Sequence, residues 1–431
     1  MSPERALGVK ATASAAVALT AIALAGATAT AHSQSVAAHA GEAQSPVTSR
    51  ARSVHVTRDD VLVFSDPDLD GARRGSLIGG SYFTLLERAP SKGGCADEWF
   101  RVGNAAWLCA TNAELTGHPP SVSSDVSGSY GLPYRYYFVG PNGSFGYSSL
   151  ALADETIPDS QLEPGFAVAA LEIRQRGEQS YALTTHGLWL PLRDLSPVTP
   201  SNFHGRALDP ANRAANLDLG WVFTDKAPVY KQPGKRSSDK LERLTEVTIA
   251  SERRYNGALW FEIGPERWLE ATRVRRLSRA TPPLDVGESE RWIDVDTRSQ
   301  VLTAYQGTTP VYATLVSTGK GAVGSEQETP LGEHRVWVKL RTSDMTNVEE
   351  VSVSTPYAIE EVPWVQFFKQ GYGLHAAFWH DAFGQRRSHG CVNLSPIDAQ
   401  RLFEWTSPQM PVGFRAIHPA PGDPGTRVVV R

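Results

Sequence analysis

The stretch GLHAAFWHDAFGQRRSHGCVNLSP, residues 373–396, brings together a free thiol and several imidazoles. Cys391 directly follows Gly390, which lets the backbone come close to the sulfur without side-chain obstruction. His389 lies two residues before Cys391, on the same side of the backbone if this segment is extended. His375 lies sixteen residues before Cys391. Because a thiol attacks as thiolate, a neighbouring imidazole activates it, and the stretch predicts a histidine-assisted cysteine nucleophile.

Two other interpretations apply to the same side chains. Imidazole and thiolate are zinc ligands, but the spacing of His375, His380, His389 and Cys391 fits no zinc motif, so we expect no metal. A lone cysteine is more often buried and inert, and only its histidine neighbours argue against that here. Phe378 and Trp379 are expected to pack in the core, with a platform for the substrate as the other interpretation. His380 is expected at the surface or in packing.

Outward from this stretch, the chain predicts a β-rich domain. From about Arg291 onward, RWIDVDTRSQVLTAYQG and TPLGEHRVWVKL alternate apolar and polar residues between turns. Residues 317–320, Ser-Thr-Gly-Lys, lack the glycine-rich loop and helix of a phosphate-binding site, and we expect a β-turn there. Only residues 397–406 show helical spacing, after Ser395-Pro396, which fits a cap followed by proline at the first helical position.

The order His375, then Ser-His-Gly-Cys at 388–391, then Asn393 resembles the signature of the L,D-transpeptidase (YkuD-type) family. The resemblance covers about residues 287–420, and it includes LVSTGK and TPLG. It implies that Cys391 attacks the carbonyl of the third residue of a peptidoglycan stem tetrapeptide and expels D-Ala. An amine on an acceptor stem then takes over the acyl group and forms a 3→3 crosslink.

The resemblance also implies roles for the neighbouring residues. His375 would be the general base and His389 would orient the catalytic pair, while Ser388 and Gly390 would shape the backbone around the intermediate. Backbone N–H groups after the glycine are candidates for an oxyanion hole. Many members carry Arg where this chain has Asn, which leaves the holder of the substrate carboxylate open. The candidate substrate-binding residues are Tyr357 (with Tyr372 also near), Asn393 and Arg387 (or Arg386).

Before this domain the sequence repeats. WFRVGNAAWLCA (99–110) and WFEIGPERWLEA (260–271) both read as hairpins with two Trp residues eight apart. YALTTHGLWLPL (181–192) keeps that spacing between Tyr and Trp. The pattern resembles bacterial SH3-like domains, which implies small β-barrels at 55–117 and 218–278 and a diverged one at 130–200. Pro/Ser/Gly-rich segments at 118–129 and 279–288 mark boundaries. The barrels would bind the cell wall or act as spacers.

The N-terminus predicts export. Arg5 and Lys10 precede the Ala-rich stretch 11–31, which ends in Ala-Thr-Ala, as in a cleaved signal peptide at 1–31. An uncleaved membrane anchor is the poorer interpretation, because the stretch is only weakly hydrophobic. Residues 32–54 are expected to be a disordered leader. Of three cysteines, Cys95 and Cys109 flank a predicted hairpin and are expected to pair in the periplasm or cell wall, leaving Cys391 free.

Composition narrows the function classes. Hydrophobic residues make up 41% and charged residues 20%, which fits a folded, multi-domain protein. The net charge of −4 gives no electrostatic case for nucleic acid. We therefore expect a mainly β protein, two or three small barrels followed by the catalytic domain, with peptidoglycan stem peptides as partners and no cofactor. A hydrolase with the same cysteine, and a non-catalytic wall-binding protein, stay open, and no feature indicates an oligomeric state.

Overall fold

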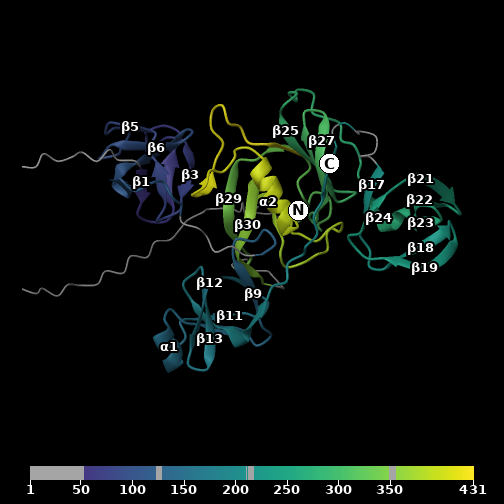
Figure 1. The fold of residues 1–431 in the computed structure, drawn as a ribbon, viewed down its shortest axis with the longest axis horizontal. Helices are drawn as coiled ribbons and strands as arrows, with labels where there is room; N and C mark the ends of the chain where they lie inside the picture. Colours follow the sequence, from purple (N-terminus) through teal and green to yellow (C-terminus); the bar gives the residue numbers. More distant parts are fainter. Residues whose placement is uncertain (1–52, 123–128, 210, 212–217, 349–355) are drawn as a thin grey trace, which may run out of the picture.

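The computed structural model describes residues 53–122, 129–209, 211, 218–348 and 356–431. Three β modules lie around a central C-terminal domain (Figure 1). The predicted signal peptide, and the leader up to residue 52, fall outside the described residues. The last two leader residues were predicted wrongly, because Ser53 and Val54 are buried at the start of β1, Ser53–Val56. In the described part of the chain, no helix has the length and apolarity needed to cross a membrane.

The first module is built from two small sheets. Strand β1 lies between β4 and β8 in one sheet, and the other has the order β3-β2-β7-β6-β5. Apolar side chains from both sheets form one buried cluster. Its remaining strands are β2 Val61–Phe64, β3 Arg73–Leu77, β4 Tyr82–Thr84, β5 Glu87–Ala89, β6 Trp99–Gly103, β7 Ala106–Cys109 and β8 Ala113–Thr116.

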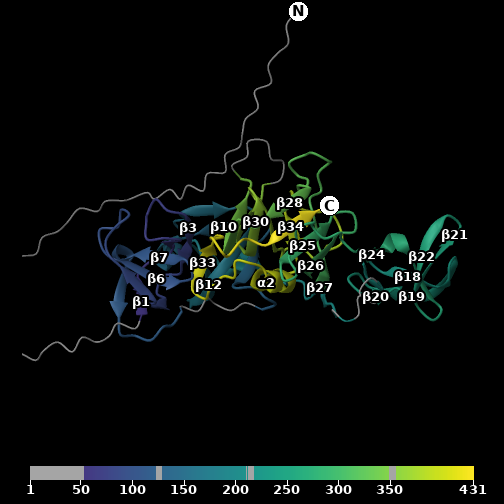
Figure 2. The ribbon, with the colours of Figure 1, turned by 90° about the horizontal axis from the view of Figure 1, so that it is seen from above.

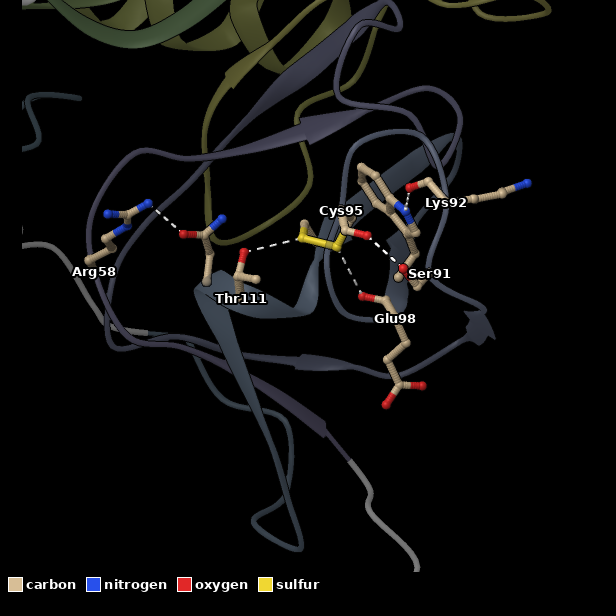
Figure 3. The surroundings of a disulfide bond; sticks show 9 residues. Arg58, Ser91, Lys92, Cys95, Glu98 and Thr111 are labelled. Atoms are coloured by element: carbon tan, nitrogen blue, oxygen red, sulfur yellow. Dashed lines mark hydrogen bonds between the residues drawn. A yellow bond between two sulfur atoms is a disulfide. The ribbon is translucent and has the colours of Figure 1, made fainter.

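A disulfide joins Cys95 to Cys109 in this module (Figure 3). It packs among buried aromatic rings, Trp99 and Trp107 included. The loop that carries Cys95 is fixed by further hydrogen bonds, since the Trp99 indole N–H donates to the carbonyl of Lys92 at 2.9 Å. The bridge therefore ties the loop before β6 to the end of β7.

The middle and third modules are also built mainly from short β-strands. The middle one contains β9 Arg135–Val139, β10 Ser144–Gly146, α1 Leu150–Glu155, β11 Ser160–Leu162, β12 Ala167–Arg176, β13 Gln179–Thr184, β14 Trp189–Pro191 and β15 Leu195–Pro197. The third contains β17 Leu219–Val222, β18 Ala227–Gln232, β19 Lys235–Leu241, β20 Glu246–Thr248, β21 Ser251–Tyr255, β22 Ala258–Gly264, β23 Arg267–Glu270 and β24 Val274–Arg276. Between them, the short β16, Arg206–Ala207, pairs with the C-terminal domain.

The predicted hairpin recurs in all three modules with one register. Trp99 pairs with Cys109, Tyr181 with Pro191, and Trp260 with Glu270, always ten residues apart. A three-residue 3-10 helix follows each hairpin and leads into a further strand. The aromatic spacing in the sequence therefore identified a recurrent hairpin, including the diverged copy.

The C-terminal domain has two sheets with a buried apolar cluster between them and helix α2, Pro396–Trp405. One sheet has the order β16-β27-β26-β25-β34-β28, and the other contains β33, β29, β30, β31 and β32. The strands are β25 Arg291–Asp296, β26 Val301–Gln306, β27 Thr309–Leu315, β28 Gly332–Arg335, β29 Val338–Thr346, β30 Ala358–Lys369, β31 Tyr372–Ala376, β32 Val392–Leu394, β33 Phe414–Ile417 and β34 Arg427–Val430.

The predicted end of this domain, residue 420, is too early. Strand β34 pairs in parallel with β25 and antiparallel with β28, so it lies inside the sheet. Val428 and Val430 are buried in the main apolar cluster. The β-branched run at the C-terminus is the sequence signal for this strand.

Helix α2 begins as the sequence predicts. The Ser395 hydroxyl accepts a hydrogen bond from the Asp398 N–H, and proline occupies the first helical position. At its other end the fully buried Lys339 of β29 donates to three backbone carbonyls. These acceptors are Phe403, Thr406 and Pro408, at 2.5, 3.0 and 2.8 Å. An ammonium has three N–H donors, so each finds a partner.

Strand pairing continues between the modules and the C-terminal domain. Strand β3 of the first module pairs with β33, and β33 pairs with β29. Strand β12 of the middle module pairs in parallel with β30 at Ala167 and Ile359. The result is one sheet of fifteen strands that runs through three parts of the molecule, and the two views show the modules against the central domain (Figures 1 and 2). The sequence did not predict this continuity.

Candidate active site

The geometry of the site depends on the parallel pairing of β31 with β32. Leu374 pairs with Val392, and His375 pairs with Asn393. Leu374 and Val392 are both fully buried in the apolar cluster, so the alternation of a strand turns His375 and Asn393 to the opposite face. Cys391 directly precedes β32, next to the Val392 that pairs with Leu374 and two residues before the Asn393 that pairs with His375. The two residues that the sequence separates by sixteen positions are thus neighbours.

Cys391 is the free cysteine of the described residues and is partly exposed. Its sulfur lies 3.7 Å from the carbonyl oxygen of Gly371, to which the thiol donates. Burial of the sulfur raises the pKa of the thiol, and a hydrogen bond from the Gly373 backbone N–H opposes this effect. The thiol is therefore protonated at neutral pH until a base takes its proton.

The segment around the thiol is a bend and not an extended strand. Gly390 has φ +124°, a conformation that favours glycine. The prediction that His389 and Cys391 share a side assumed an extended segment, and it does not hold here. His389 is exposed, and its ring stacks on Tyr357 with a centroid separation of 5.7 Å and an interplanar angle of 4°. The structure thus brings two predicted site residues together at the rim.

Hydroxyl groups hold the backbone of this bend. The Ser388 hydroxyl donates to the Cys391 carbonyl and accepts from the Gly390 N–H at 3.1 Å. The Thr329 hydroxyl donates to the Gly390 carbonyl at 2.8 Å and accepts from Gly319. Ser388 therefore links the backbone on both sides of the Gly390–Cys391 bond. Thr329 was missed as a site residue, although its TPLG segment was recognised.

Residues 317–320 do not form the predicted turn. Their backbone is extended and pairs with the motif: Ser317 bridges Asn393, and Gly319 bridges Ser388. The Thr318 carbonyl also accepts from the N–H groups of Arg387 and Ser388. Because Gly319 lies against backbone on one side, a Cβ there would clash, which explains the glycine better than a turn does. The Asn393 N–H donates to Ser317, so it is occupied and does not serve an oxyanion.

His375 is 2% exposed and keeps a defined ring orientation. Its Nδ1 lies 3.0 Å from the Ala376 carbonyl, which places the proton on Nδ1 and directs Nε2 away. The ring of Trp379 stacks on it with a centroid separation of 5.8 Å. Burial lowers the pKa of His375 to about 4, so the imidazole is neutral at neutral pH.

Asn393 and His380 differ from their predicted roles. Asn393 is 4% exposed, and its amide lies 3.0 Å from Nε2 of His380, so it contacts a histidine and not an open cleft. His380, expected at the surface or in packing, is a partner of the motif. Phe378 is core, as expected, and lies against Tyr136 of the middle module.

The remaining candidates lie around the rim. Arg387 is exposed next to the motif, which leaves its guanidinium accessible to a ligand. Tyr372 donates from its hydroxyl to the Glu326 carbonyl at 2.8 Å, and its ring lies against Gly390. In the described residues, no group of three or more His, Cys, Asp or Glu side chains is arranged to hold a metal ion.

The comparison with protein families agrees with this geometry. The model of the L,D-transpeptidase catalytic domain (YkuD) matches residues 290–430, which include all of β25 to β34. Residues 290–430 are an L,D-transpeptidase catalytic domain. The match covers about a third of the chain and leaves the three modules outside it. No curated protein matches the chain.

Solved L,D-transpeptidases are similar over parts of the chain. The crystal structure of a mutant Enterococcus faecium L,D-transpeptidase shares 24% identity over 33% of this chain, with a TM-score of 0.25, and this chain spans half of its length. The L,D-transpeptidase from Xylanimonas cellulosilytica shares 21% sequence identity, with a TM-score of 0.23. The match covers 35% of this chain and 64% of that structure's chain. An L,D-transpeptidase from Mycobacterium smegmatis shares 15% sequence identity, with a TM-score of 0.26. The match covers 61% of this chain and 99% of that enzyme.

A cavity of about 880 Å³ lies beside the L,D-transpeptidase catalytic domain. The domain contributes residues 378–381 to its lining, and the rest comes from the middle module, the third module and residues 198–204 between them. Trp379 and His380 therefore line the cavity and also contact His375 and Asn393.

Proposed function

We propose that the protein is an exported peptidoglycan L,D-transpeptidase that uses Cys391 as its nucleophile and forms 3→3 crosslinks. The observation that carries the proposal is the parallel pairing of β31 with β32, in which His375 lies opposite Asn393, two residues after Cys391. The family match of residues 290–430 supports the same reaction class. Export and a periplasmic or cell-wall location are proposed from the signal-peptide pattern of residues 1–31.

In the first half-reaction, the Cys391 sulfur attacks the carbonyl carbon of the third stem residue while His375 Nε2 takes the thiol proton. The tetrahedral intermediate collapses, the amide bond to the terminal D-Ala breaks, and His375 returns the proton to the leaving amine. D-Ala departs, and the donor stem stays on Cys391 as a thioester. We expect the Cys391 N–H to stabilise the oxyanion, with Ser388 and Gly390 fixing its direction.

In the second half-reaction, an acceptor amine attacks the thioester carbonyl. His375 accepts the proton that this amine loses and passes it to the departing Cys391 sulfur, so that the free enzyme is restored. Burial shifts the pKa values of both groups in the substrate-free enzyme. A raised thiol pKa and a lowered imidazole pKa keep both groups neutral at rest, so charge forms only during attack.

The residues proposed to contact the substrate lie around the Cys391 motif. We propose that the stacked rings of Tyr357 and His389 form one wall of the groove that binds the stem peptide. His389 is exposed and lies two residues before Cys391, so this wall is next to the nucleophile. We assign His389 to this wall in place of orienting the catalytic pair. Arg387 is the candidate for holding a stem carboxylate through paired N–H donors. The three modules are proposed to be SH3-like and to bind or position the enzyme on the wall.

The test is mass spectrometry of disaccharide-tetrapeptide muropeptides incubated with the mature protein, with Cys391→Ala as the matched control. We expect 3→3 dimers and released D-Ala with the wild type and neither with the variant. Tripeptide without dimers would instead establish the hydrolase that uses the same cysteine. Unchanged tetrapeptide in both samples, together with binding of the protein to sacculi, would refute the enzyme and favour a wall-binding protein.

A further inference from the structure

The loop of residues 377–387 connects β31 to the cysteine motif and covers the catalytic histidine. Trp379 in this loop stacks on His375, and the next residue, His380, is hydrogen-bonded to Asn393 in β32. His380 also packs its ring against Phe383, whose side chain is fully buried. The loop is thus fixed directly after Trp379, and Trp379 both stacks on His375 and lines the large cavity.

The hydrogen bonds of His380 determine which of its nitrogens carries the proton. Its Nδ1 accepts from the Ala382 backbone N–H at 3.2 Å, so Nδ1 is unprotonated. A neutral imidazole then has its proton on Nε2, which must donate. The atom of Asn393 at 3.0 Å must therefore be the amide oxygen. The opposite amide orientation would set two donors against each other and leave the buried Asn393 oxygen without a partner.

The third module holds the same loop from outside. Arg243 contacts both the carbonyl and the carboxylate of Asp381, the residue after His380. Arg275 donates from Nε to the Gly384 carbonyl at 2.8 Å, and its guanidinium lies 3.7 Å over the ring of Phe223. The loop is therefore braced on its outer side by a module that supplies no reactive group.

We propose that His380 is a positioning residue: its Nε2–H donates to Asn393 Oδ1 and holds the loop so that Trp379 stays on His375 and keeps water from it. This proposal rests on the proposed function only in naming His375 as the base. The arrangement gives Asn393 its role. It lies next to His375 in the parallel pair and anchors the loop that covers that ring.

The groups around His380 and its burial together determine its pKa. Arg387, Arg243 and the catalytic His375 disfavour its protonation, Asp381 favours it, and burial outweighs them all. Burial lowers the pKa of His380 to about 4, so it stays neutral and keeps one donor and one acceptor. The hydrogen bonds on both of its nitrogens therefore persist through neutral pH.

The first test is the tautomer of His380 in the wild-type protein. The chain has eleven histidines, so ¹⁵N-histidine labelling gives a tractable NMR spectrum, assigned with His380→Gln and His375→Gln. We expect a protonated Nε2 and an unprotonated Nδ1 at neutral pH. A protonated Nδ1 in the wild-type protein would overturn the proposal.

The second test is the titration of the His375 ring, followed by NMR. His380→Phe keeps a ring but removes both hydrogen bonds, and we expect the His375 midpoint to rise by about one unit or more from 4 toward 6.5 as water enters. His380→Gln can still donate to Asn393 and should stay near the wild-type value. His418→Gln, at a partly buried histidine outside the loop, is the matched control.

A folded His380→Phe variant with an unchanged His375 midpoint would overturn the proposal, as would a His380→Gln variant that behaves like His380→Phe. Neither readout needs a substrate. If they succeed while muropeptides stay unchanged, the proposed function fails and the positioning role stands. If muropeptides are crosslinked but the His375 midpoint does not change in His380→Phe, the positioning role fails and the proposed function stands.

Discussion

Replacing Gly390 by alanine tests whether the bend before the nucleophile is essential. Gly390 has φ +124°, and a Cβ there would lie 2.8 Å from Cδ1 of Tyr372 and closer still to Cε1. An ordinary contact begins at 3.4 Å, so ring and bend must separate by at least 0.6 Å. The Tyr372 hydroxyl is held by Glu326, so movement of the ring loses that bond and movement of the bend displaces Cys391.

Two costs add in this variant. The backbone conformation costs a side-chain-bearing residue about 1–3 kcal/mol. The forced displacement of packed groups costs about 1–3 kcal/mol more. Gly332→Ala is the matched control, because Gly332 has φ +109° and a Cβ there would meet nothing within 4 Å. We therefore expect Gly390→Ala to be less stable than Gly332→Ala by the displacement cost alone.

Denaturant unfolding of the full chain measures the stability difference, and muropeptide turnover measures the effect on Cys391. A displacement of the nucleophile approaching 1 Å should lower turnover by about 10-fold to 100-fold, whereas Gly332→Ala should keep most activity. Adding Tyr372→Ala to Gly390→Ala should recover part of the stability. The reasoning is refuted if Gly390→Ala matches Gly332→Ala in stability and the wild type in turnover.

Three further outcomes are expected. Removing the disulfide with Cys95→Ala and Cys109→Ala should destabilise the first module by about 3 kcal/mol, measured by thermal unfolding, with Cys391 alkylation unchanged. Lys339→Met should cost about 1–3 kcal/mol in denaturant unfolding, because three buried carbonyls lose their donor; an unchanged stability would contradict that role. Since burial lowers the pKa of His375 to about 4, the base stays unprotonated above that value, so turnover should fall only as the pH drops toward 4; an acid limb centred near 6.5 would show a solvated His375.

Local patterns in the sequence predicted local structure well. Aromatic spacing identified hairpins because residues ten apart pair across a short turn, as at Trp99 and Trp260. Ser395 and Pro396 marked the start of α2 because cap and first-turn preferences act within a few residues. The pairing of modules through β12 and β30 was not predictable, since any exposed strand edge has the same backbone donors and acceptors.

In the candidate site, too, residues within one motif could be predicted from the sequence, and their distant partners could not. The residues of the motif were identified because their chemistry is unusual, whereas their partners have ordinary side chains. Nothing in the sequence near Thr329 shows that its hydroxyl reaches Gly390, sixty-one positions away. His380 was taken for a surface or packing residue, because its partner Asn393 becomes a neighbour only when β32 lies beside β31.

The fifteen-stranded sheet limits how this protein can be divided. A fragment cut to residues 290–430 would lose the strands that pair with β30 and β33 and would expose their unpaired backbone groups to other copies. Recombination during evolution meets the same limit. A new module in the first or middle place must supply a strand of matching register, so these modules cannot be exchanged as freely as domains on linkers.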